Sequence, residues 1–129
     1  MLQRDYLMRL ITLFAESIRR SWTLAKVDDD PRAAVDTLEA MIGEATDIDG
    51  AILLSLAPES IAGVMQVSAV DPKVTGYIVR SLVLASGYLA EAGEAELAQL
   101  RADQARAIAD AYGIEAPSFE DAADVPGDA

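Results

Sequence analysis

The chain lacks cysteine and histidine entirely, and aromatic residues are scarce. The absence of cysteine excludes disulfides, thiolate nucleophiles and cysteine-based metal sites, and the absence of histidine removes the commonest general base and metal ligand. Only seven of the 129 residues are aromatic, whereas 24 are alanine. We therefore expect no enzyme activity, no catalytic residue, no cofactor and no metal site, and a core that depends on close helix packing.

Basic residues are also few, because 10 Lys and Arg stand against 22 Asp and Glu, for a net charge of −12. Nucleic-acid binding requires basic side chains that neutralise phosphates, so this composition argues against it. The charge is unevenly spread: residues 1–26 are net +3, which leaves −15 on residues 27–129. The sequence shows no secretory signal and no lipidation motif, so we expect a cytoplasmic protein with little membrane contact.

Residues 71–93 form the segment around which we expect the fold to be organised. Asp71 and Pro72 are typical of a helix start, and Gly93 is typical of a helix end. Between Val74 and Ala90 the only charged residue is Arg80, and apolar residues cover nearly every face. This pattern predicts a central helix enclosed by other helices, because polar residues in the segment argue against a membrane span. Its two glycines, Gly76 and Gly87, are predicted to mark close helix crossings.

Apolar residues at three- and four-residue steps predict further helices over residues 2–25, 31–47, 51–57, 58–68 and 94–112. The sequence therefore predicts an all-α fold, an antiparallel bundle of stacked helical hairpins with five to six helices, in one domain over residues 1–113. Apolar residues in the middle segment are expected to pack on the central helix: Ile52, Leu53, Leu56, Ile61, Val64 and Met65.

Residues 114–129 form an acidic tail with five acids and no basic residue. Because this tail has little to bury, we expect it to be mobile beyond about Ser118. Docking of Phe119 on the helical body is the alternative.

The central and last predicted helices together resemble one tetratricopeptide hairpin. Positions typical of the first helix are matched by Leu84, Ala85 and Tyr88, the turn by Gly93, and the small positions of the second helix by Ala98, Ala102 and Ala105. The match needs a one-residue slip between the helices, lacks the usual Trp and closing Pro, and shows no 34-residue array. The resemblance implies a helical hairpin, and tetratricopeptide-like proteins use concave faces to hold peptides.

The opening MLQRDYLMRLI and the later AILLSLAPESI resemble a family of short bacterial all-helical proteins of unknown function that carry tetratricopeptide-like hairpins. The matching residues are Met1, Asp5, Tyr6, Met8 and Arg9, followed by Leu53, Leu54, Ser55, Leu56 and Pro58. Because that family has no assigned activity, the resemblance carries no site residues to this chain.

Two groups of residues are candidates for binding. Arg19, Arg20 and Trp22 lie on the basic first helix and could form a surface for an acidic partner or an anionic membrane, although a packed helix with a solvated face explains them too. Tyr77, Arg80 and Tyr88 could be the polar groups of a pocket between helices, although Arg80 could equally pair with an acid or reach solvent. The TDIDG sequence lacks the acids that a calcium loop requires, and we interpret Asp49 as a helix cap.

We favour the interpretation that the protein is a non-catalytic protein–protein interaction or scaffold module that binds another protein or a second copy of itself. A sensor for a small molecule or anion near Arg80 is the first alternative. Attachment to a membrane surface through the first helix is the second.

Overall fold

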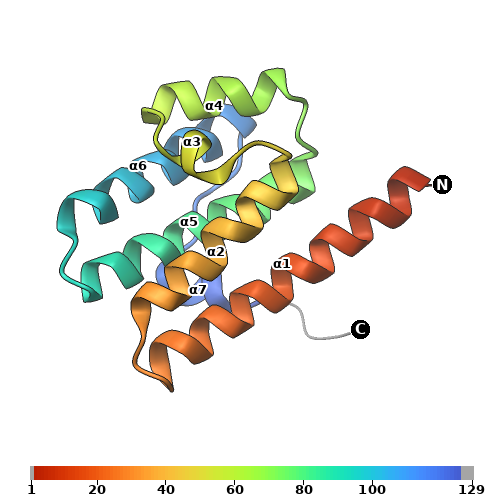
Figure 1. Ribbon diagram of the computed structural model, residues 1–129. Helices are drawn as coiled ribbons and strands as arrows, with labels where there is room; N and C mark the ends of the chain where they lie inside the picture. Colours follow the sequence, from red (N-terminus) through yellow and green to blue (C-terminus); the bar gives the residue numbers. More distant parts are fainter. Residues whose placement is uncertain (1, 126–129) are drawn as a thin grey trace.

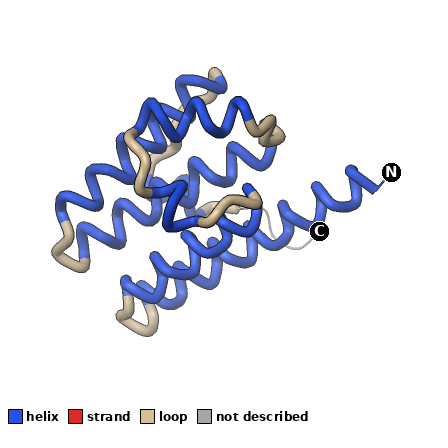
Figure 2. Tube along the Cα trace, turned by 45° about the horizontal axis from the view of Figure 1, so that its top comes forward, coloured by secondary structure: helices blue, strands red, loops and turns tan. Residues whose placement is uncertain are grey.

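The computed structural model describes residues 2–125, which form seven helices and no strand (Figures 1 and 2). The all-α prediction is confirmed, with one helix more than expected. The helices are α1 (Leu2–Lys26), α2 (Pro31–Thr46), α3 (Gly50–Leu54), α4 (Pro58–Val67), α5 (Pro72–Glu91), α6 (Ala95–Tyr112) and α7 (Phe119–Ala123).

Aspartate caps fix the starts of three helices. Asp30 accepts a hydrogen bond from the backbone N–H of Ala33 at 3.1 Å, and Asp71 accepts one from Lys73 at 2.8 Å. Asp49 caps α3 in the same way, so the helix-cap interpretation of this residue is confirmed. These caps satisfy first-turn amides that have no partner inside the helix, and each contributes about 1 kcal/mol.

The α5 helix lies at the centre of the molecule, as the sequence predicted. It packs against α6, α2, α1 and α7, and ten of its residues are buried. α5 and α6 form an antiparallel hairpin across Gly93, which has the positive φ of 83° that favours glycine. The Ser86 hydroxyl joins the two helices by donating to the Ala98 carbonyl at 2.7 Å. α5 is thus the helix against which the other layers are assembled.

The middle segment differs in part from its prediction. Leu53, Ile61 and Met65 join the core, but α4 packs mainly against α6, which covers it more fully than α5 does. Ile52 is 63% exposed, because the five-residue α3 has only one buried face and Leu53 and Leu54 occupy it. The expectation that every apolar residue here is buried was therefore wrong for Ile52.

The two central glycines have different surroundings. A Cβ atom built on Gly87 would lie 2.2 Å from Phe119 Cε1, so this glycine marks a close approach by a ring from α7. A Cβ on Gly76 would meet nothing within 4 Å. The predicted helix crossing is wrong for Gly76, and at Gly87 the close neighbour is a side chain.

The tail also differs from its prediction, because residues 119–123 form α7 and this helix packs on α5 and α1. Ala122 is fully buried and Phe119 contacts two aromatic rings. The alternative of a docked Phe119 describes this arrangement. The prediction relied on the acidic composition of the tail. It did not consider that one aromatic residue and two alanines are enough to pack a short helix against the body. The rest of the predicted mobile segment, residues 126–129, lies outside the described residues.

A buried polar cluster connects α6 to α2 and α3. Arg101, only 5% exposed, donates from Nε to Glu39 at 2.9 Å and from Nη1 to the Leu54 carbonyl at 2.8 Å. The fully buried Gln104 donates to the carbonyls of Leu54 and Leu56 at 3.0 and 2.9 Å. Carbonyls at the end of α3, which the helix leaves without partners, are satisfied in this way.

Candidate protein-interaction site

A groove between the carboxyl half of α1 and α5 holds α7 along its length, and we call it the tail groove. Its walls are Trp22 and Lys26 of α1 and Arg80, Gly87 and Tyr88 of α5. In Figure 1 the blue α7 lies behind α2, next to α1 and α5. The tail groove therefore brings together residues that are up to about 100 positions apart in the sequence.

Phe119 is the anchor of α7 in the tail groove. Its ring lies 5.8 Å from the Trp22 ring and 5.5 Å from the Tyr88 ring, edge-on to the latter at 88°. Such aromatic pairs contribute about 0.5 to 1.5 kcal/mol beyond the area they bury. The ring lies over Gly87, where any larger residue would collide with it. The anchor thus requires both the aromatic walls and the bare backbone of Gly87.

Arg80 holds the opposite end of α7. Its Nη1 donates to the carbonyls of Asp121 at 2.8 Å, Ala122 at 3.4 Å and Asp124 at 3.1 Å. These carbonyls belong to the last turn of α7, where the helix dipole places partial negative charge and favours a cation. Arg80 therefore donates to backbone carbonyls, whereas the sequence analysis considered only an acid, an anion or solvent as its partner.

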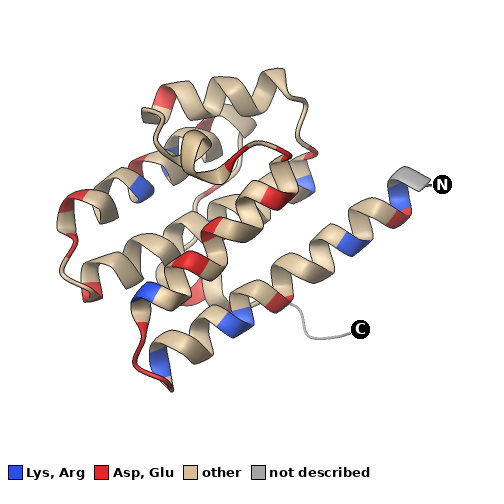
Figure 3. Ribbon diagram, viewed as in Figure 1, with Lys and Arg blue, Asp and Glu red and all other residues tan. Residues whose placement is uncertain are grey.

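The charges around the tail groove are complementary. Lys26 lies over the rings of both Trp22 and Phe119, with Nζ 5.4 and 5.3 Å from their centroids, and it also pairs with Glu91 at 3.1 Å. The tail segment 114–125 carries four acids and no basic residue. Figure 3 shows Lys and Arg spaced along α1, whereas Asp and Glu predominate on α2 beside it. The groove thus carries the cations Lys26 and Arg80, with Glu91 beside Lys26, and its occupant is acidic.

Tyr88 is fully buried at the base of the tail groove. Its hydroxyl oxygen has no hydrogen-bond partner within residues 2–125, and the neighbouring Ser21 hydroxyl donates its own proton to the Ile18 carbonyl at 2.7 Å. Burial raises the pKa of Tyr88 above its ordinary value of 10.0, Ser21 acts in the opposite direction, and the Glu91 carboxylate adds to the rise. Tyr88 therefore stays protonated and supplies an apolar ring to Phe119.

The remaining predicted binding residues are divided between different places. Arg19 lines an open hollow with Trp22, Glu120 and Asp124, beside the tail groove. Arg20 is exposed on the side of α1 that faces α2. Tyr77 stacks on Phe14 in the core, with ring centroids 5.9 Å apart. The structure thus unites Trp22, Arg80 and Tyr88 around α7 and separates Arg20 and Tyr77 from them.

The amino half of α1 forms a second surface. At ~1.5 Å per residue, the 25 residues of α1 span roughly 37 Å and the 16 residues of α2 roughly 24 Å, so α1 extends beyond its neighbour. Figure 1 shows this end projecting from the body. Tyr6 is 58% exposed and Met8 55% exposed. A hollow of about 570 Å³ lies below, lined by residues that include Leu7, Leu10 and Val70.

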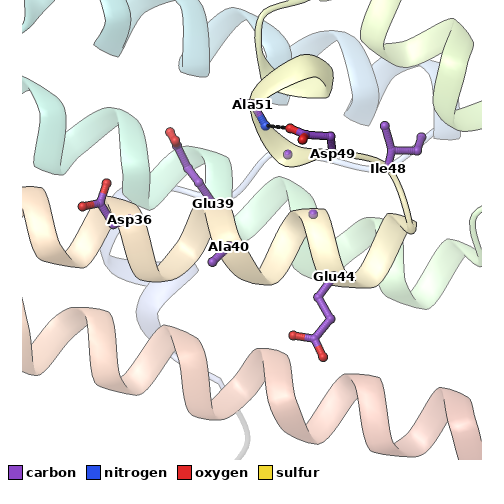
Figure 4. Close-up of a pocket in the computed structure, with 9 residues that line it drawn as sticks. Asp36, Glu39, Ala40, Glu44, Ile48, Asp49 and Ala51 are labelled. Carbon is purple, nitrogen blue, oxygen red and sulfur yellow. Dashed lines mark hydrogen bonds between the residues drawn. The ribbon is translucent and has the colours of Figure 1, made fainter.

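A third hollow, of about 500 Å³, lies over α2 and the start of α3 and is acidic (Figure 4). Its acids do not converge: in Figure 4 Glu44 points toward α1, away from Asp49. Glu39 is bound by Arg101, and Asp49 accepts from the Ala51 amide at 2.9 Å. Among the residues that the structure describes, no group of three or more acids could hold a metal ion.

The sequence reasoning missed Arg101 as a structural residue. A signal was present, because Arg101 is three residues after Ala98 and four before Ala105, on the small-residue face of the helix. A charged residue on a face that packs closely requires a buried partner. Phe119 was considered only as an alternative, since a single aromatic in an acidic segment is a weak signal.

Comparisons with protein-family models, with curated proteins and with solved structures found no match to this chain. No helix within residues 2–125 is long and apolar enough to cross a membrane. The fold and the surfaces described above are therefore the basis for a functional proposal.

Proposed function

We propose that this protein is a non-catalytic interaction module that pairs with a second copy of itself through the amino half of α1. The observation that carries the proposal is the overhang of α1 beyond α2, which leaves Tyr6 and Met8 more than half exposed, with Tyr6 beside a hollow of mixed polar and apolar lining. Tyr6 and Met8 are two residues apart and therefore point to different sides of the helix. Exposed apolar residues on a helix end that projects beyond its neighbour are typical of interaction surfaces.

The charges of the amino half favour a second copy as the partner. Arg4, Asp5 and Arg9 place both signs within two turns. A two-fold interface brings the same patch of both molecules together, so an antiparallel pair of α1 helices can match acids with bases. An aromatic residue and a methionine, Tyr6 and Met8, lie between these charges, and both types are enriched in the cores of interfaces.

The experiment is light scattering of the full chain over a series of concentrations up to the high micromolar range. We expect a mass that rises from monomer to dimer. In the double variant Tyr6→Glu with Met8→Glu, the dimer should dissociate at all concentrations tested. The matched control is Val67→Glu, which places the same charge on an apolar residue that is 88% exposed elsewhere. A wild-type monomer at the highest concentration would overturn the proposal.

The two other functions considered gain less support. Arg80 donates to α7 carbonyls, so an anion at this residue would have to displace the tail. Trp22 lies against Phe119, so a membrane would meet it only in part. Each remains a separate proposal, tested by anion titration of the full chain and by sedimentation with anionic vesicles at low salt.

A further inference from the structure

The tail groove holds a segment with the features of a bound peptide. α7 has only five residues, and a helix this short is not stable by itself in water, so the groove imposes its conformation. One aromatic anchor fills a site lined by aromatic rings, and one arginine binds the carbonyl end. Recognition of a short helix by a groove with an aromatic anchor is a recurring mode of protein–peptide binding.

The segment that links α6 to α7 is loosely held. Residues 114–116 are exposed, and no hydrogen bond described for this chain involves residues 115–117. Arg80 donates hydrogen bonds to backbone carbonyls of α7 and of Asp124, and Lys26 lies over the Phe119 ring. α7 itself contributes the fully buried Ala122 and the Phe119 ring to the packing, but a five-residue helix on an exposed connection opens at a lower free-energy cost than the whole protein. The tail can therefore leave the groove while α1, α5 and α6 stay packed.

The body of the protein carries the chemistry that selects the occupant. Its groove offers two aromatic rings, the bare backbone of Gly87 and the cations Lys26 and Arg80. Arg80 binds backbone carbonyls, which every helical segment has at its carboxyl end. This contact therefore does not select for a particular side chain. Selectivity comes from the aromatic anchor and from negative charge that complements these cations.

We propose that the tail groove is a recognition site for an acidic helical segment of another protein with one aromatic anchor, and that the chain's own tail occupies the site until such a segment displaces it. The chain's own tail weakens binding of the partner, because only the fraction of molecules with an open groove can bind it. This site is distinct from the amino half of α1, so it does not rest on the self-association proposed above.

The test uses a fluorescein-labelled peptide with the sequence of residues 114–125 as a probe of the required chemistry. It is titrated with the full chain and with full-length Phe119→Ala, in which the anchor of the tail is lost and every wall of the groove is kept. We expect the variant to bind the peptide at least about tenfold more tightly than the wild type, by anisotropy, because its groove is open. Trp22, the sole tryptophan, should change its emission when the peptide binds.

Two control peptides define the chemistry. One replaces phenylalanine by alanine, and the other replaces its aspartates and glutamates by lysine; both should lose most of the binding to Phe119→Ala. Equal binding of the alanine peptide would overturn the assignment of the anchor. Equal binding of the lysine peptide would overturn the charge complementarity.

A second opening variant, Ala122→Asp, places a charge at a fully buried position of α7 and keeps Phe119. It should also bind the peptide more tightly than the wild type while it keeps the helical circular dichroism of the body. Peptide affinity equal to that of the wild type in both variants would overturn the proposal. Loss of helical signal in both variants would do so as well, because the tail would then be a required part of the core.

Discussion

The two halves of α1 belong to one helix with one apolar stripe, but their surroundings differ. In the carboxyl half, Ile18 and Ser21 are fully buried and Trp22 lies against Phe119. In the amino half, Tyr6 and Met8 are more than half exposed. The carboxyl half is covered by α2, α5 and α7, whereas the amino half extends beyond the end of α2.

Helix periodicity predicts the apolar stripe, on which Leu10 and Ile18 are both buried, but it does not predict what covers residues at or beyond the margin of that stripe, such as Tyr6 and Met8. The carboxyl half obtains its cover mainly from α2 and α5, and the chain's own tail covers Trp22. In the amino half Leu10 is buried and Leu7 packs against the core, whereas Tyr6 and Met8 have no such cover within residues 2–125, and a second copy is the cover that we propose. Substitutions in the covered half should therefore lower the stability of the fold, whereas those in the projecting half should mainly weaken association.

The largest expected contrast is between Ile18→Ala and Met8→Ala. Ile18 is fully buried, so its truncation should lower the free energy of unfolding by about 2 to 5 kcal/mol, through lost burial and a cavity. Met8 is 55% exposed, so its truncation should change stability by less than about 0.5 kcal/mol. Urea denaturation at low protein concentration, where association is negligible, measures both. Similar losses would show that the amino half is covered within one molecule.

A second contrast uses the glycines of α5, which share a helix but differ in what they meet. Gly76→Ala should stabilise the protein by about 0.5 to 1 kcal/mol, because alanine favours the helix and a Cβ there meets no atom within 4 Å. Gly87→Ala gains the same propensity but displaces Phe119. Its melting temperature should therefore be lower than that of Gly76→Ala, and its Trp22 emission should shift to longer wavelength. An unchanged emission spectrum would contradict docking of the ring on Gly87.

The third prediction concerns pH. Because the pKa of Tyr88 is raised in the folded protein, the unfolded chain releases this proton first as pH rises. Its contribution to stability is fully present below pH 10 and falls as pH rises from the unfolded pKa through the folded one. Tyr88→Phe should remove this alkaline loss and should be neutral or stabilising by about 1 kcal/mol at neutral pH, since the hydroxyl has no partner. A loss of stability at neutral pH would reveal a hydrogen bond to Tyr88.

The smallest expected effect is that of Lys26→Ala in the covered half. Its pair with Glu91 is largely exposed and its two ring contacts are partly solvated, so the loss should be about 0.5 to 1 kcal/mol and should shrink at high salt. The matched change in the projecting half, Arg9→Ala, should have no measurable effect on unfolding. Chemical denaturation of both at low and high salt checks this, and equal losses would contradict the role of α7 in placing Lys26.

Much of the fold could be predicted from local patterns. The starts at Pro31, Pro58 and Pro72 and the burial of α5 follow from caps, prolines and apolar periodicity, which act within a few residues. The candidate site could be predicted only in pieces. Trp22, Arg80 and Tyr88 were identified separately, because no local pattern indicates that three distant residues contact one short helix.

The amino-acid sequence by itself determined helices α1 to α6, their approximate ends and the choice of α5 as the enclosed one, since backbone propensity and periodic burial are local properties. Only the tertiary structure decided that Phe119 lies on Gly87, that Arg80 binds the carbonyls of α7 and that Ile52 and Met8 stay exposed. Each of these depends on the relative lengths of neighbouring helices and on which surfaces pack together. Such long-range contacts produce no periodic pattern in the sequence.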